Sequence, residues 1–209
     1  MVVGEILMKI RSLVLFLAFA CASLTAFPTS ALACACCADR GFYSISYQQP
    51  GTYLRDEIAK IKFAPTANLF LGGAGEDSVK GILSVAETYK LLGKFAPASW
   101  EMTFTTGTKT GVLTLPLPDK VLNYKVDTHE NEESRGDVTL YKELRFAGTT
   151  SGTGIFQAGI VAPTKYFLVL QGRGNLCDSA PDYTHWRLEI TGKKASYAFF
   201  GKLTNSRKL

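Results

Sequence analysis

The residues of this sequence with the clearest chemical potential are four of its five cysteines and one histidine. Cys34, Cys36 and Cys37 stand within one short segment, and Cys177 precedes His185 by eight positions. Thiolate and imidazole groups are the ligands that Zn(II) and Cu(I) favour, so these five residues could form a soft tetrahedral or trigonal metal site. The same cysteines could instead form disulfides, since an even number of cysteines in an oxidising compartment is typical of a disulfide framework.

The spacing favours disulfides over a metal site. The sequence has no second C-x-x-C pair, and three sulfurs so close together at a chain end are hard to direct at one ion. Adjacent Cys36 and Cys37 cannot bond to each other without straining the peptide between them, so we expect one cysteine of the cluster to reach Cys177. Such a bridge closes a long loop and stabilises a fold by roughly 2–5 kcal/mol. We therefore expect no cofactor, with Zn or Cu as the alternative.

No group of residues in the sequence identifies a catalytic reaction. There is no G-x-S-x-G nucleophile elbow, and the glycine-rich stretch 172–175 lacks the spacing of a dinucleotide loop and the Lys-Ser/Thr of a phosphate loop. His129 lies in the charged stretch 127–137, which reads as an exposed loop, and His185 has no evident serine partner in sequence. The sequence thus favours a binding or structural protein without turnover. The alternative is a thiolate-based metal-binding protein or metal-dependent enzyme that uses the N-terminal cysteine cluster.

A candidate binding surface lies in a stretch where polar and apolar residues alternate. Tyr141, Glu143 and Arg145 alternate with the apolar residues Leu140, Leu144 and Phe146, which we expect on the opposite, buried side. Alternate residues of a strand point to the same face, so this pattern places a tyrosine and two charges on one accessible surface. Aromatic rings of this kind stack on sugars or line apolar pockets. We expect the three residues to bind a small molecule or an envelope component.

The start of the chain predicts export. Lys9 and Arg11 precede an apolar run at 13–20, and the triplet 31–33 has the A-x-A form of a cleavage site. A basic start, an apolar middle and a small-residue end are the three parts of a secretory signal peptide. The run is shorter than the about 20 apolar residues that a membrane span needs. We therefore expect residues 1–33 to be a signal peptide that is removed.

Cleavage at this point removes Cys21 and makes Cys34 the first residue of the mature protein. A lipid on Cys34 is the main alternative to a free N-terminus, although lipoprotein signals favour leucine where this chain has Ala31. The predicted location is therefore secreted or periplasmic, with anchoring to the cell envelope through this lipid as the variant. We expect contact with a membrane only through such a lipid.

The charge pattern argues against a nucleic-acid partner. The full chain carries a formal net charge of +5, and removal of Lys9, Arg11 and Glu5, a net +1, leaves the mature protein near +4. Its basic residues are scattered, apart from the pairs 193–194 and 207–208. A nucleic-acid interface usually gathers Lys and Arg on one face or in a run. We expect no binding to nucleic acid.

The residues discussed above must be positioned by strands. Apolar residues recur at every second position in the stretches 100–104, 113–117 and 186–190, which is the signature of half-buried strands. The stretch 166–170 is almost wholly apolar, as expected of a strand covered on both faces. Glycine-containing turn signals separate these stretches at intervals that fit successive antiparallel hairpins.

The best-defined hairpin joins residues 184–190 to residues 195–200. Helix is expected only at 53–61, where apolar residues have three-to-four spacing, and in a short turn near 74–81. No repeat or linker divides the chain after the signal. The sequence therefore predicts that residues 34–209 form a single all-β domain, an antiparallel β-barrel or β-sandwich with few or no helices.

Overall fold

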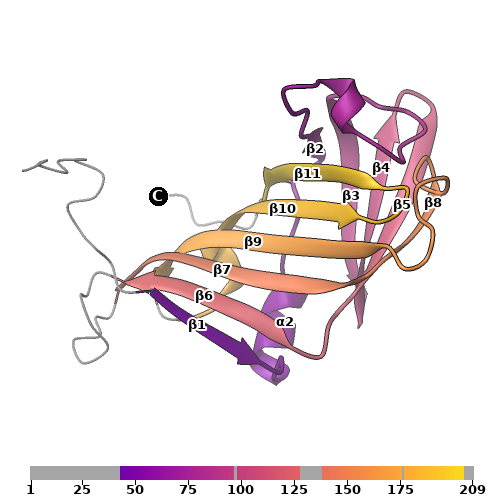
Figure 1. The fold of residues 1–209 in the computed structure, drawn as a ribbon. Coiled ribbons are helices and arrows are strands. Elements are labelled where there is room, and N and C mark those ends of the chain that lie inside the picture. The colour runs from indigo at the N-terminus through magenta and orange to yellow at the C-terminus, as the bar shows by residue number, and fades with distance from the viewer. Residues whose placement is uncertain (1–42, 97, 128–137, 176, 205–209) are drawn as a thin grey trace, which may run out of the picture. The chain divides into compact units, whose positions relative to one another are not determined.

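The computed structural model of this chain describes residues 43–96, 98–127, 138–175 and 177–204 (Figure 1). These residues belong to one compact unit that spans Arg40–Leu209. The predicted signal peptide, the cysteines Cys34, Cys36 and Cys37, and the loop that contains His129 lie outside the described residues.

The described part of the chain is mainly one antiparallel sheet of 11 strands. In chain order the strands are β1 (Tyr43–Gln48), β2 (Thr66–Leu69), β3 (Thr88–Ala96), β4 (Ser99–Thr106), β5 (Lys109–Pro116), β6 (Val121–Asp127), β7 (Val138–Thr149), β8 (Ser151–Gly154), β9 (Lys165–Asn175), β10 (Tyr183–Thr191) and β11 (Ser196–Lys202). In the sheet their order is β1-β6-β7-β9-β10-β11-β2-β3-β4-β5-β8. The prediction of an all-β antiparallel fold is confirmed.

Helical structure is scarce among the described residues. The one α-helix is α2 (Thr52–Ala59), where the apolar spacing predicts a helix. The stretch near 74–81 contains only the 3-10 turn η2 (Glu76–Ser78), and a second such turn, η4 (Ala180–Asp182), precedes β10. Neither α2 nor any other helix in this part of the chain has the length and apolar character needed to cross a membrane.

The sheet is neither a closed barrel nor a pair of separate sheets. Among the described residues, the hydrogen-bonded order of the strands ends at β1 and at β8. Along the chain, however, β8 comes directly after β7, with only Thr150 between them. β6 pairs with β7 and β5 pairs with β8, so these four strands act as one long hairpin that bends near Thr150. The Thr150 hydroxyl donates to the Thr114 carbonyl at 2.8 Å across this bend. In Figure 1, β3, β4 and β5 consequently cross the direction of β7, β9 and β10 steeply.

Aromatic side chains fill the space that the folded sheet encloses. Phe104 of β4 stacks on Phe199 of β11 with ring centroids 4.4 Å apart, and Trp100 meets the edge of Phe146 of β7 at 4.8 Å. These four side chains are fully buried, and so is Phe156. Interlocked rings add about 0.5–1.5 kcal/mol per pair beyond the burial of their area. The interior is therefore a packed core.

The helix α2 covers one end of this core. Leu54 and Ile58 are buried on its inner side, and Ile61 follows them just after the helix. In Figure 1 the helix lies behind β6 and β7, so the opposite faces of these strands are turned toward the viewer. We call that side the outer face of the sheet.

Candidate functional site

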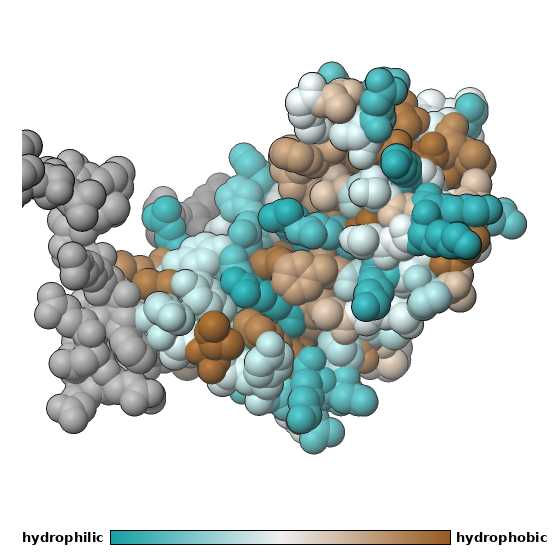
Figure 2. Space-filling model, in the orientation of Figure 1, coloured by the Kyte–Doolittle hydropathy of each residue, from teal (hydrophilic) through white to brown (hydrophobic). Residues whose placement is uncertain are grey.

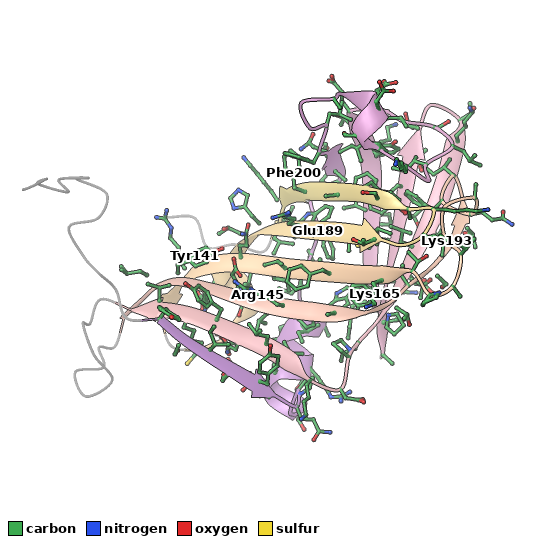
Figure 3. All side chains as sticks on the ribbon, in the orientation of Figure 1. Tyr141, Arg145, Lys165, Glu189, Lys193 and Phe200 are labelled. Atoms are coloured by element: carbon green, nitrogen blue, oxygen red, sulfur yellow. The ribbon has the colours of Figure 1, made fainter. Side chains whose placement is uncertain are left out.

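The three residues of the predicted binding surface come together on the outer face of β7. The Tyr141 hydroxyl donates a hydrogen bond to Glu143 Oε1, and Arg145 Nε donates to Glu143 Oε2. Gln171 of β9 adds a bond from its Nε2 to the Tyr141 hydroxyl oxygen at 2.9 Å. Figure 3 shows Tyr141 and Arg145 on neighbouring parts of this strand. The structure thus brings together the residues that alternation alone grouped.

A tyrosine of the adjacent strand β6 completes the group. Tyr124 stands opposite Glu143 in the β6–β7 register, and its ring centroid lies 5.0 Å from the guanidinium carbon of Arg145. Its ring also meets that of Tyr141 edge to face, with centroids 6.3 Å apart. A guanidinium at this distance is attracted to the ring face. We call Tyr124, Tyr141, Glu143, Arg145 and Gln171 the Tyr141 cluster.

The cluster is held in one geometry by its own bonds. Burial raises the pKa of Tyr141, and its hydrogen bond to the Glu143 carboxylate raises it further, because both favour the neutral phenol. Tyr141 therefore remains a hydrogen-bond donor at neutral pH. Both oxygens of Glu143 are engaged, and its side chain is 11% exposed against 30% for Arg145. The guanidinium is thus the charged group most open to a ligand.

The aromatic surface continues from the cluster to the edge of the sheet. Tyr43, Ile45 and Tyr47 alternate along β1 on the outer face, and each is more than half exposed. The Tyr43 ring centroid lies 6.1 Å from that of Tyr124. Figure 2 shows hydrophobic and hydrophilic residues side by side across this face. Exposed tyrosines and charged groups therefore share one broad surface.

A shallow groove lies farther along the outer face. It has a volume of about 430 Å³ and is lined by Phe70, Arg187, Ala198, Phe199 and Phe200. A second hollow of about 240 Å³ shares Phe70, Arg187 and Ala198 with it. The guanidinium of Arg187 forms an ion pair with Glu189 at this site. Both hollows are open to solvent and extend the outer surface.

A second polar cluster, which the sequence pattern did not reveal, lies on the inner face. Lys142 is fully buried, its Nζ lies 3.0 Å from Asp182 Oδ2, and it donates to the Cys177 carbonyl. Nearby, Asp178 accepts from Asn123 Nδ2 at 2.7 Å and pairs with Lys125 at 3.2 Å. These contacts fasten the loop between β9 and β10 to β6 and β7. We call this group the Lys142 cluster.

The close approach of this loop depends on one glycine. A Cβ atom at Gly172 of β9 would overlap the carbonyl oxygen of Asp182 and stand 2.9 Å from the Tyr183 Cα. Only a residue without a side chain leaves room there, so the loop can lie against the strand.

One signal in the sequence could have indicated the Lys142 cluster, although alternation did not single it out. Lys142 lies two positions before the inward-facing Leu144, so a charged residue falls on the buried side of the strand.

Two of the predicted metal ligands, His185 and Cys177, lie in the described part of the chain, on different sides of the sheet. His185 is exposed on the outer face, opposite Gln171, and its Nδ1 lies 2.9 Å from the Thr184 hydroxyl. Cys177 is exposed in the loop between β9 and β10, and its backbone carbonyl accepts a hydrogen bond from the inward-facing Lys142. Among the described residues, no three His, Cys, Asp or Glu side chains are grouped to hold a metal. Because the other three cysteines lie outside this range, the disulfide and metal interpretations both stay predictions.

None of the protein-family models matches this sequence, and neither a curated protein nor a solved structure matches it. Any inference about function therefore rests on the chemistry of the two clusters. The charged groups of the Lys142 cluster pair with one another and with the loop backbone, as expected of a structural anchor. The Tyr141 cluster is partly open and rigid, as expected of a binding surface.

Proposed function

We propose that this protein is an exported, non-catalytic binding module that recognises a carbohydrate of the cell envelope through the Tyr141 cluster. The observation that carries the proposal is the position of Arg145. Its Nε is bonded to Glu143 and its guanidinium carbon lies 5.0 Å from the Tyr124 ring centroid, so the guanidinium is held in place before any ligand arrives. A group that is fixed in advance costs less entropy on binding.

The chemistry of the cluster suits a sugar. The C–H faces of a sugar ring can pack on tyrosine rings, and its hydroxyl or carboxylate oxygens can accept bonds from a guanidinium. Tyr43 and Tyr47 offer further exposed rings beside the cluster, so that several sugar units of a chain could be contacted at once. The small number of convergent polar groups among aromatic rings is the usual composition of a ligand site.

Export and disulfide bonding belong to the same proposal. The sequence features that support them are the signal-like start and the even number of cysteines left after cleavage. A bridge from the N-terminal cysteines to Cys177 would add a covalent link at the loop that the Lys142 cluster already fastens. A lipid on Cys34 would keep the module at the envelope, close to the polysaccharides we propose that it binds.

The test is binding of purified protein to a panel of envelope polysaccharides, followed by titration calorimetry with the best of them. We expect Arg145→Ala to weaken binding about tenfold, which corresponds to about 1.4 kcal/mol. Arg55→Ala is the matched control, because Arg55 also bonds through Nε, to the Pro50 carbonyl, but on α2. Equal affinity of both variants, or no binding of any polysaccharide by the unaltered protein, would overturn the proposal.

A second pair of variants separates ring stacking from general loss of structure. Tyr141→Ala removes a ring of the cluster, whereas Tyr53→Ala removes an exposed ring from α2, outside the cluster. We expect only the first to weaken polysaccharide binding, with both variants retaining the circular dichroism spectrum of the unaltered protein. If Tyr53→Ala weakens binding as much as Tyr141→Ala, the site lies elsewhere.

A further inference from the structure

The strand β1 is an open edge of the sheet. It is the first strand in the hydrogen-bonded order, so among the described residues it pairs with β6 on one side and with no strand on the other. Every residue of β1 except Gln48 is exposed. An edge strand presents a row of backbone N–H and C=O groups that can pair with another chain.

Within β1 itself, the described residues lack the charges, prolines and bulges by which proteins usually prevent such pairing. The sequence of β1, Tyr43–Gln48, contains no charged residue and no proline, and its register with β6 is unbroken over six residues. Charged side chains, prolines and bulges are the common protections of an edge. The opposite edge of the sheet, β8, is a four-residue strand with two glycines, which makes it a poorer template.

The sequence of β1 is also symmetric. Residues 43–47 read Tyr-Ser-Ile-Ser-Tyr in both directions, with Ile45 at the centre. An antiparallel strand pair has a local two-fold axis at each pair of directly opposed residues. If two copies of β1 meet in antiparallel orientation at Ile45, identical residue types face each other over residues 43–47.

We propose that this edge pairs with β1 of a second copy of the chain, forming a two-fold symmetric dimer centred on Ile45. Tyr43 then stands opposite Tyr47 of the partner subunit, and the two Ile45 side chains meet at the axis. Each serine at 44 faces the serine at 46 of the other copy on the inner side. A self-complementary surface of this kind is what a two-fold interface requires.

Charge, cross-strand side-chain pairs and interface area determine the expected strength of this dimer. Because β1 is uncharged, two copies bring no like charges together, and aromatic and β-branched residues are favourable cross-strand partners. A single six-residue strand pair covers less than the about 1,200–2,000 Å² of a stable interface. We therefore expect a reversible dimer that dissociates in the micromolar range. It would join the outer faces of both copies into one continuous surface.

Sedimentation velocity over a series of protein concentrations tests the dimer directly. We expect the purified protein to shift from monomer to dimer as its concentration rises. Ile45→Lys, which places two ammonium groups at the axis, should weaken the dimer about tenfold or more. Leu92→Lys is the matched control, since Leu92 is 71% exposed on β3, and it should leave dimerisation unchanged. A protein that stays monomeric, or an equal effect of both variants, would overturn the inference.

A pair of double variants tests the register. Ser44→Glu with Ser46→Lys puts opposite charges across the interface twice when the axis is at Ile45, so this variant should dimerise at least as well as the unaltered protein. Ser44→Glu with Ser46→Glu puts four carboxylates together in the same register and should dimerise least. The inference fails if the two double variants dimerise equally. It does not depend on the proposed carbohydrate, because dimerisation is measured without ligand.

Discussion

The Nζ atom of Lys142 lies 3.0 Å from Oδ2 of Asp182 in a place where neither side chain is more than 5% exposed. The ring of Tyr183 lies beneath the ammonium, 5.3 Å from Nζ to the centroid. The pair joins β7 to the end of the β9–β10 loop. Two charges withdrawn from water this far depend on each other, because removing either one takes a nearby opposite charge away from the other.

Removing the Lys142 ammonium should therefore lower the stability of the folded protein. We expect Lys142→Met to lower the free energy of unfolding by about 3–5 kcal/mol, since the buried carboxylate of Asp182 loses the ammonium 3.0 Å away. Urea unfolding followed by tryptophan fluorescence measures this change. The double variant Lys142→Met with Asp182→Leu removes both charges and should recover much of the loss. A double variant less stable than the single one would show that the pair does not act as a unit.

The pH dependence of stability should report the anchor between α2 and the β9–β10 loop. Glu57 accepts bonds from Lys60 Nζ at 2.6 Å and from the Ala180 backbone N–H at 2.7 Å. The Lys60 bond first, and then the Ala180 bond, lower the pKa of Glu57 below its ordinary value of 4.5. A carboxylate with a lowered pKa in the folded state stabilises the fold above its unfolded pKa. That contribution is lost as the pH falls through the folded value.

Glu57→Gln should consequently destabilise the protein near neutral pH, by about 1–2 kcal/mol. At a pH below the lowered folded-state pKa, where the glutamate is protonated in both states, the difference from the unaltered protein should nearly vanish. Chemical unfolding at a series of pH values checks this convergence. Glu76→Gln, at an exposed position, is the control and should change stability little at any pH. A difference between Glu57→Gln and the unaltered protein that stays constant with pH would contradict the interpretation.

Intact mass of the protein from its own exported fraction should settle the state of the cysteines. We expect the mature chain to begin at Cys34, and its thiols to react with an alkylating reagent only after reduction. Peptide mapping should then join Cys177 to a cysteine of the N-terminal cluster. Alkylation without reduction, together with an ion that is lost on denaturation, would favour the metal interpretation. A chain that retains residues 1–33 would contradict cleavage, and an added lipid mass on Cys34 would establish anchoring.

The period-two patterns were sufficient to predict the fold class, because alternation is a local property of the chain. The same property grouped Tyr141, Glu143 and Arg145 correctly. Alternation failed at Leu140, which it placed with Leu144 on the buried side. The pairing of β7 with β9 shifts between Thr139 and Lys142, and Leu140 is 40% exposed. A bulge of this kind changes the face of a residue without any local signal of its own.

Contacts between distant segments were beyond such a prediction. Tyr124 and Gln171 join the Tyr141 cluster through the register of β7 with β6 and β9, which one strand's sequence does not encode. Asp178 and Asp182 reach the inner face only because their loop folds under the sheet. Sheet closure also depends on pairing, so the sequence left barrel and sandwich open where the structure has one bent, unclosed sheet.

The aromatic core between the two halves of the sheet has a kinetic consequence. A protein that holds a ligand in an internal cavity must open before the ligand can enter or leave, and that motion limits the rate of ligand exchange. Here the rings of Trp100, Phe104, Phe146 and Phe199 occupy the centre. A partner that binds to the outer face meets a surface that is already formed. Its arrival would therefore be limited by diffusion and orientation, and its residence time would determine its affinity.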